Sequence, residues 1–237
     1  MDGLPEHSIR EHARAKRVRI KVSAQDGVEI IVPAGFDRRE IPALLLEHAE
    51  WLDHAMRQVA ERREFLEVTS ARPERIALRA VGETWRVAWN ETSARSWRPS
   101  EAEGSLLTLS GGSGDSERWE TAAKKWVVHK AKERLIPWMG REAANCRIPI
   151  EKTIIRCQKT RWGSYSTRGT VSLNAQLMFL PTDLVRYVMI HEACHAIHSG
   201  HSREFWALVA EHQAGHGALR KALRAAWRFV PGWMING

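Results

Sequence analysis

Apolar and polar residues alternate along residues 17–33, on both sides of an Asp26-Gly27 pair. The alternating apolar positions are Val18, Ile20, Val22, Val28, Ile30 and Val32. A period of two that is broken by Asp-Gly is typical of two antiparallel strands joined by a tight turn. The pattern therefore predicts a β-hairpin at the start of the chain.

The spacing of apolar residues changes after the hairpin. Residues 37–66 contain only one proline and no glycine, and Asp37 can cap the first turn of a helix. Apolar and aromatic side chains then recur at the helical period, at Ile41, Leu44, Leu45, His48, Trp51, Leu52 and Met56. This spacing predicts a helix that packs on the hairpin.

The middle of the chain returns to strand character in three runs, at 76–81, 85–89 and 105–109, and a GGSGDS segment follows at 111–116. Glycine and serine clusters of this kind mark loops. We therefore expect two regions, a hairpin–helix–strand region at 1–112 and a second region at 113–237, both parts of one larger unit.

The second region alternates between helix and strand signals. A long helix is predicted from about 115 to 145, with Pro137 kinking it or ending its first part. Short strands are predicted at 153–157 and 170–174, and a second helix from Leu184 to His198, where neither glycine nor proline occurs. The predicted fold class is α+β.

Composition agrees with a soluble globular protein, because 43% of the 237 residues are hydrophobic and 27% are charged. No apolar run approaches the length of about 20 residues that a membrane span needs, and the first residues lack a secretory signal, so we expect a cytoplasmic protein without a membrane partner. Three cysteines without a CxxC pair argue against a disulfide framework or a cysteine-rich zinc site.

The formal net charge is +8, and arginines gather at 10–19 and 220–228. Such a balance suits an anionic partner such as a nucleotide or nucleic acid, but it also suits a solvated surface. Recognised nucleic-acid-binding motifs are absent from the sequence. Both interpretations of the charge therefore stay open.

The second predicted helix carries His191, Glu192 and His195. Residues four apart project from the same face of a helix, about 6 Å apart, so both imidazoles can bind one ion. Glu192 projects about 100° away and can reach a water molecule bound to that ion, which is the arrangement of H-E-x-x-H sites. The spacing predicts a divalent metal site, best suited to zinc, with Glu192 as the general base.

A catalytic zinc usually takes three protein ligands. His201 is the candidate for the third, because Gly200 before it allows the chain to turn back toward the helix. His198 is the alternative, but it lies about 10.5 Å along the helix axis from His191 and better suits the helix C-terminus. Tyr187, one turn before His191, and Arg161 are candidates to stabilise an oxyanion.

Several short segments resemble the YgjP-like metallopeptidase family, which is related to the M48 and SprT-like zinc peptidases. They are Thr160 to Ser164, Leu173-Asn174, Tyr187-Val188, the HEACH run at 191–195, His201-Ser202 and Phe205-Trp206. The resemblance covers roughly residues 10–212. It implies a zincin-like region with the HExxH helix packed on a small sheet, His191, His195 and His201 as zinc ligands, and Glu192 as catalytic acid and base.

The resemblance further implies that Arg161, Trp162 and Asn174 line the active-site cleft, and that an edge strand beside the metal pairs with an extended peptide. Two features depart from the family. Tyr165 stands where many members have cysteine, and the residues after Trp206 differ, with His212 and His216 expected at the surface or at helix ends.

Three functions therefore compete: a zinc peptidase acting on peptides or proteins, a metal-dependent hydrolase of a nucleotide phosphoanhydride, and a SprT-like peptidase that acts in association with nucleic acid.

Overall fold

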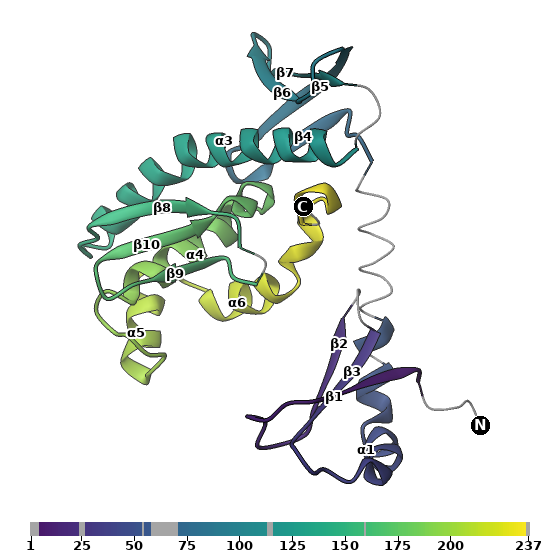
Figure 1. Cartoon of the computed structure of the whole chain (residues 1–237). Coiled ribbons are helices and arrows are strands. Elements are labelled where there is room, and N and C mark those ends of the chain that lie inside the picture. Colours follow the sequence, from purple (N-terminus) through teal and green to yellow (C-terminus); the bar gives the residue numbers. More distant parts are fainter. Residues whose placement is uncertain are drawn as a thin grey trace. The chain divides into compact units, whose positions relative to one another are not determined.

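The computed structural model describes residues 5–23, 27–53, 55–57, 71–112, 116–158 and 160–235. The fold is mixed α+β and divides into two compact units, Met1–Val68 and Thr69–Gly237 (Figure 1). Each unit has its own hydrophobic core. In the described part of the chain, no helix combines the length and the apolar character that crossing a membrane requires.

The N-terminal unit contains the predicted hairpin. Its elements are β1 (His7–Glu11), β2 (Arg19–Ser23), β3 (Gly27–Val32), the 3-10 turn η1 (Arg38–Glu40) and α1 (Ile41–Glu47). β2 and β3 pair antiparallel, which confirms the predicted hairpin, and Ile20 lies opposite Ile30. Gly27, predicted in the turn, is the first residue of β3, and residues 24–26 lie outside the described residues. β1 was not predicted, because its sequence is mostly polar; it pairs parallel to β3.

The predicted cap Asp37 accepts a hydrogen bond from the backbone N–H of Arg39 and caps the 3-10 turn η1, which leads directly into α1. Ile41, Leu45 and Leu52 are buried in the same cluster as the strands. Trp51 and Met56, expected on the same face, are instead 49% and 40% exposed. His48 has φ −103° and ψ 17°, and this break in the helix shifts the period for the residues that follow. Residues 58–66 of the predicted helix lie outside the described residues.

The C-terminal unit contains two sheets. The first has the order β4-β5-β7-β6 and the second the order β8-β10-β9. Their strands are β4 (Arg75–Leu78), β5 (Glu83–Thr92), β6 (Arg98–Ala102), β7 (Leu106–Gly112), β8 (Lys152–Arg156), β9 (Gly163–Tyr165) and β10 (Thr170–Asn174). All five predicted strand regions form strands, whereas β6 and β9 were not predicted.

The boundary between the units falls at Val68 and not at the glycine-rich segment after residue 110. Gly111 and Gly112 are the last residues of β7, so the strand region belongs to the C-terminal unit. A side chain at position 111 would collide with Trp97, because a Cβ there would lie 2.5 Å from its ring. The glycine therefore serves close packing inside the sheet, which the sequence pattern could not distinguish from a loop.

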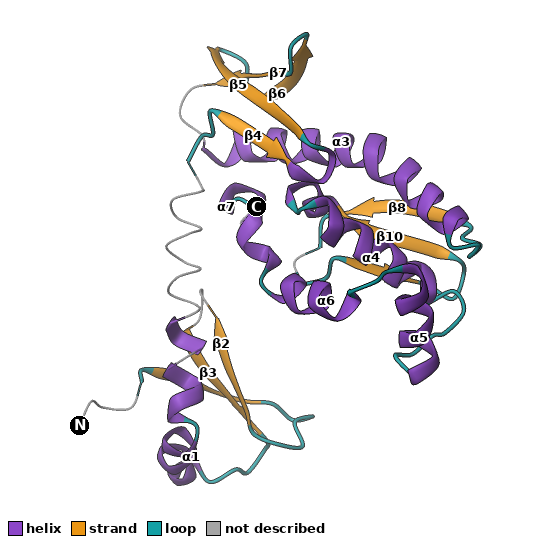
Figure 2. Cartoon of the chain, turned by 180° about the vertical axis from the view of Figure 1, so that it is seen from behind, coloured by secondary structure: helices purple, strands orange, loops and turns teal. Residues whose placement is uncertain are grey.

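Helix α3 (Ser116–Asn145) connects the two sheets of this unit and contacts both (Figures 1 and 2). The helix is 30 residues long and continues through Pro137, so it does not end there, which was one of the two predicted effects of the proline. Its buried side chains are Trp119, Ala122, Ala123, Trp126, Val127, Lys130, Ala131, Leu135, Met139, Glu142 and Ala143. Burial on this scale outweighs the roughly 3 kcal/mol that a proline costs inside a helix.

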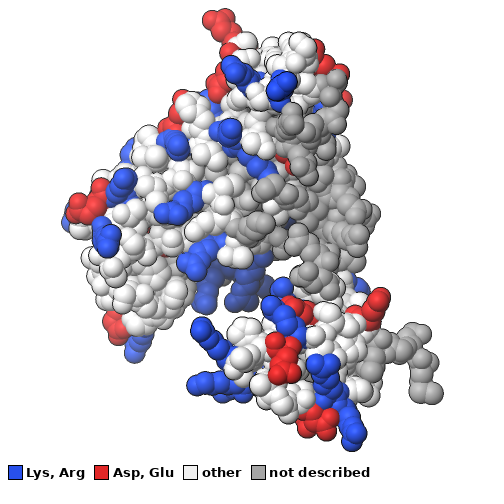
Figure 3. All heavy atoms as spheres, viewed as in Figure 1, with Lys and Arg blue, Asp and Glu red and all other residues white. Residues whose placement is uncertain are grey.

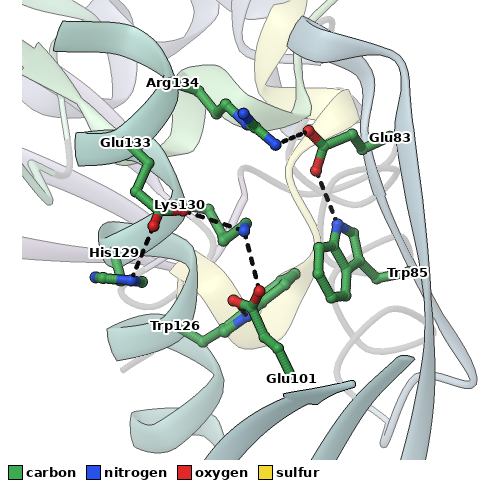
Figure 4. Close-up of polar contacts among 8 residues, drawn as sticks. All are labelled: Glu83, Trp85, Glu101, Trp126, His129, Lys130, Glu133 and Arg134. Carbon is green, nitrogen blue, oxygen red and sulfur yellow. Dashed lines mark hydrogen bonds and ion pairs between the residues drawn. The ribbon is translucent and has the colours of Figure 1, made fainter. Parts of the chain in front are cut away.

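Polar contacts fasten α3 to the four-stranded sheet (Figure 4). The buried Lys130 Nζ lies 3.1 Å from carboxylate oxygens of both Glu101 and Glu133. Burial alone would lower the pKa of Lys130, but hydrogen bonds and charge from Glu133 and Glu101 outweigh it and raise the pKa. The Nε1–H of Trp126 donates to the remaining oxygen of Glu101, so the carboxylate is satisfied on both sides.

The second half of this unit is helical. The elements are η2 (Arg79–Val81), η3 (Ala175–Phe179), α4 (Thr182–Cys194), α5 (Arg203–His212), α6 (His216–Arg224), η4 (Ala226–Phe229) and α7 (Gly232–Ile235). α4 contacts β9 and β10 and lies behind their sheet in Figure 1. A helix packed on a small sheet thus carries the His-Glu pair.

Candidate metal centre

Helix α4 holds the first part of the site in a buried position. It begins after Pro181, with Asp183 in its first turn, and its apolar side chains are buried in the main core. The helix ends at Cys194, with His195 as its C-cap, so the predicted extension to His198 does not form as α-helix. A tight turn continues from there, in which the N–H of His198 donates to the carbonyl of Cys194.

Three imidazoles converge where this helix ends. One ring nitrogen from each of His191, His195 and His201 lies within 4.8 Å of the others. His191 lies in the last turn of α4 and His195 is its C-cap, while His201 comes from the loop before α5 and places its Nε2 3.2 Å from that of His191. The structure brings together the three histidines that the spacing selected, and His198 is not among them.

The separations agree with a shared metal ion. Two zinc–nitrogen bonds of about 2.0–2.1 Å at a tetrahedral angle hold their nitrogens about 3.3–3.4 Å apart. The 3.2 Å between Nε2 of His191 and Nε2 of His201 is close to that value. The donor set therefore fits zinc, with a fourth position left open because no fourth protein ligand joins the three in the described part of the chain.

The surroundings of His191 and His201 favour the neutral imidazole, as metal binding requires. Burial lowers the pKa of His191 to about 3, and the neighbouring His195, His201 and Arg220 contribute to that shift. Burial, His195 and Arg220 also lower the pKa of His201. The lone pairs therefore stay available at neutral pH.

Hydrogen bonding and stacking hold the ring orientations. His195 Nδ1 lies 3.0 Å from the carbonyl of His198, so it carries the proton and leaves Nε2 for a metal. His198 thus contributes its backbone to the site. Phe205 stacks on His195 with ring centroids 4.6 Å apart, and Trp206 stacks on His201 at 5.5 Å.

Glu192 is only 7% exposed and lies next to β9. Burial raises its pKa to about 7, while a hydrogen bond from the backbone N–H of Tyr165 and the charge of Arg161 oppose that rise. A carboxyl with a pKa near neutrality can both accept and return a proton. Tyr165 supplies only its backbone to this bond, so the departure from cysteine at that position leaves the contact intact.

Gly163 determines how closely the strand approaches this carboxylate. A Cβ at position 163 would lie 2.7 Å from Cγ of Glu192 and 2.9 Å from its Oε1. Only glycine, which has no side chain, allows β9 to lie this close to Glu192. The sequence contains this glycine inside its Arg-Trp-Gly-Ser run, but the reason for it becomes visible only when the strand and the helix are placed together.

The predicted cleft residues have different surroundings. Arg161 is exposed and acts on Glu192 through its charge. Trp162 is buried and stacks on Trp227 with centroids 3.8 Å apart. Tyr187 is buried beside His191, with ring centroids 5.9 Å apart, and burial raises the pKa of its hydroxyl.

Asn174 is fully buried and holds the loop before β9. Its Nδ2 donates to the carbonyls of Gln158 and Arg161 at 2.7 and 2.8 Å, and its Oδ1 accepts from the backbone N–H of Gln176. All of these partners belong to the chain itself. The residue therefore positions the segment that carries Arg161 to Gly163 and has no free polar atom for a substrate.

Two hollows meet at the three histidines. One, of about 580 Å³, extends toward α6, and the other, of about 700 Å³, extends along β9 and the turn after α4. Gly163, His191, Glu192 and His201 line both. The first hollow is also lined by Arg220, Leu223, Arg224 and Trp227, which the sequence reasoning did not assign to the site.

A pair of helix-borne histidines, a third imidazole and an adjacent buried carboxylate form the kind of site found in metal-dependent hydrolases. Residues 16–226 match the family model described as YgjP-like, metallopeptidase domain. The chain therefore belongs to the YgjP-like metallopeptidase family. No match was found among the curated proteins or the solved structures with which the chain was compared.

Proposed function

We propose that this protein is a zinc-dependent peptidase in which His191, His195 and His201 hold the metal and Glu192 moves the protons. The proposal is supported above all by the position of Glu192, a buried carboxyl with a pKa near 7 directly after a histidine of the converging trio. Zinc bound there would supply a Lewis acid that polarises the scissile carbonyl and lowers the pKa of water.

Residues of the chain itself carry out the proton transfers, position the catalytic carboxylate and stabilise the oxyanion. Glu192 accepts the proton of the attacking water and returns it to the leaving nitrogen. The backbone N–H of Tyr165 holds the carboxylate in place during both transfers. Burial keeps the hydroxyl of Tyr187 protonated, so it can donate to the oxyanion from inside the hollow that it lines.

Strand β9 supplies a docking edge for an extended peptide. It is the outer strand of the order β8-β10-β9, so one side of its backbone has no strand partner among the described residues. Ser164 and Tyr165 of this strand line the second hollow beside the histidines. A peptide that adds to this edge would pass directly over Glu192.

The experiment that tests the proposal compares wild type with Glu192→Gln, using Glu211→Gln on the exposed side of α5 as the control for loss of a carboxylate. Zinc content is measured by elemental analysis, and turnover is measured on a casein-type peptide panel beside a nucleoside triphosphate panel. We expect Glu192→Gln to bind zinc but lose at least 100-fold in kcat, because general acid–base catalysis contributes about 10²–10⁴-fold. Undiminished cleavage by this variant would show that the assigned base is wrong.

The panel also separates the competing functions. Hydrolysis of triphosphates alone would replace the peptidase proposal by a phosphoanhydride hydrolase, for which the arginines of the first hollow would be suitable contacts. Peptide cleavage that requires added DNA or RNA and falls steeply with salt would favour the SprT-like alternative. That the bound metal is zinc and not another divalent ion is a prediction, as is the cytoplasmic location of the protein.

A further inference from the structure

Helix α6 presents two arginines to the metal-centre hollow. Arg220 and Arg224 are one helical turn apart, and both line the same hollow as His191, Glu192 and His201. The nine residues of α6, His216 to Arg224, include no acidic residue. Figure 3 shows Lys and Arg side chains gathered at the lower edge of the C-terminal unit in that view, where α6 lies.

Neither guanidinium is neutralised within the described chain. Other arginines of this unit pair with carboxylates, for example Arg134 with Glu83 at 2.6 Å and Arg186 with Glu142 at 3.2 Å. No described carboxylate forms such a pair with Arg220 or Arg224. Like charges four residues apart weaken an isolated helix slightly, and a bound anion would relieve this repulsion.

Arg220 is held in place before any substrate arrives. Its guanidinium lies over the Trp206 ring, 4.4 Å from the centroid, and the same ring stacks on His201 at 5.5 Å. His216 stacks on Trp206 as well, with centroids 5.7 Å apart. A guanidinium that is already ordered loses less conformational entropy when it binds a carboxylate, and its planar fork matches the two carboxylate oxygens.

The distance to the histidines limits where the anion can lie on a peptide. The stacking through Trp206 places the guanidinium of Arg220 no more than about 10 Å from the His201 ring, a length that about three extended residues span. The wall beside it is apolar, formed by Leu223 and the stacked pair Trp162 and Trp227. Such a wall accepts the aliphatic part of a side chain while the arginines take its charged end.

We propose that Arg220 and Arg224 form a carboxylate-binding subsite, so that the preferred substrate is a peptide with a negative charge within about three residues of the scissile bond. This proposal rests on the proposed peptidase function. Either a Glu or Asp side chain or a free C-terminal carboxylate can supply the charge. The cationic hollow also attracts such peptides from solution, which makes the association rate sensitive to salt.

The test uses the zinc-loaded full chain and peptides that differ at one position. Glu, Gln and Lys are placed in turn at each of the three positions on either side of the cleaved bond, with the C-terminus free or amidated. Wild type is compared with Arg220→Gln, Arg224→Gln, the double variant and Arg224→Glu. Lys221→Gln is the matched control, because it removes one charge from the same helix at an exposed position that does not line the hollow.

We expect wild type to prefer a negatively charged peptide over its neutral counterpart by at least fivefold in kcat/KM, mainly through KM, as partly exposed charge pairs allow. The double variant should lose this preference while its zinc content and Tm stay at wild-type values, and Arg224→Glu should move the preference toward Lys. Lys221→Gln should behave as wild type. Preference for the free over the amidated terminus identifies the terminal carboxylate as the source, and preference for internal Glu identifies the side chain.

Four outcomes would overturn the subsite. If wild type cleaves peptides but shows no preference for negative charge, or if the double variant keeps that preference, the subsite is refuted while the peptidase function stands. If wild type cleaves no peptide at all, or hydrolyses only triphosphates, the proposed function fails and the subsite fails with it.

Discussion

Replacing Gly163 by alanine tests the structure of the site more closely than removing a catalytic group does. The added methyl would lie 2.7 Å from Cγ of Glu192 and 2.9 Å from its Oε1. Ordinary carbon–carbon contacts are about 3.5–4.0 Å, so strand and carboxylate must separate by roughly 1 Å. Neither can move freely, because Glu192 is buried and β9 is paired with β10.

The expected result of Gly163→Ala is a large loss of activity without loss of the metal. Misplacing a catalytic group by about 1 Å costs on the order of 100-fold in rate. The three atoms nearest to the new methyl all belong to Glu192 and none to a histidine, so zinc content should stay close to one ion per chain. Overpacking should also lower the free energy of unfolding by about 1–3 kcal/mol.

The assay measures kcat on the best peptide of the panel, zinc by elemental analysis, and stability by denaturant unfolding. Gly140→Ala is the matched control. It lies inside α3, nothing lies within 4 Å of the added Cβ, and its φ is not in the left-handed region. This variant should keep full activity and gain up to about 1 kcal/mol of stability, because alanine favours a helix over glycine. A Gly163→Ala enzyme with kcat within threefold of wild type would refute the assigned placement of Glu192.

Three further predictions concern the metal, the loop and the α3 contacts. Chelation of zinc should lower Tm, and added zinc should restore it, since a ligand at 100 times its Kd stabilises by about 2.7 kcal/mol; a His201→Ala variant should show a weaker response in the same thermal scan. Asn174→Ala should lower the free energy of unfolding by roughly 1–3 kcal/mol, because it removes the donor from the partly buried carbonyls of Gln158 and Arg161. A loss below about 0.5 kcal/mol, measured by denaturant unfolding, would contradict this prediction. Lys130→Met should destabilise the fold most between pH 4.5 and pH 10.5, which are the ordinary pKa values of a glutamate and a lysine side chain. The raised pKa of Lys130 means that its contribution is complete below 10.5 and is lost as pH rises above that value, whereas the lowered pKa of Glu133 means that its contribution is lost as pH falls below 4.5. Unfolding measured across pH should therefore show the stability gap between wild type and variant narrowing at both extremes, and a gap independent of pH would contradict the ion pairs.

Most of the regular elements could be predicted from the chain because their causes are local. The hairpin follows from a period of two around Asp-Gly, and its two strands pair antiparallel as predicted. The errors fell where packing overrides local preference. Helix α3 runs through Pro137 because its side chains are buried against two sheets, and Gly111 lies within a strand because Trp97 packs on it.

Within the site, the sequence by itself determined that His191 and His195 share a face and that Glu192 stands beside them, since four residues make about one helical turn. It also indicated a third histidine after a glycine. Only the tertiary structure decided that His201 approaches His191, that the N–H of Tyr165 and the bare backbone of Gly163 hold Glu192, and that α6 brings two arginines to the same hollow. These contacts join segments separated by up to about 60 residues. The local spacing of apolar residues cannot predict which distant segments will come into contact, because burial of apolar surface in the tertiary structure decides that.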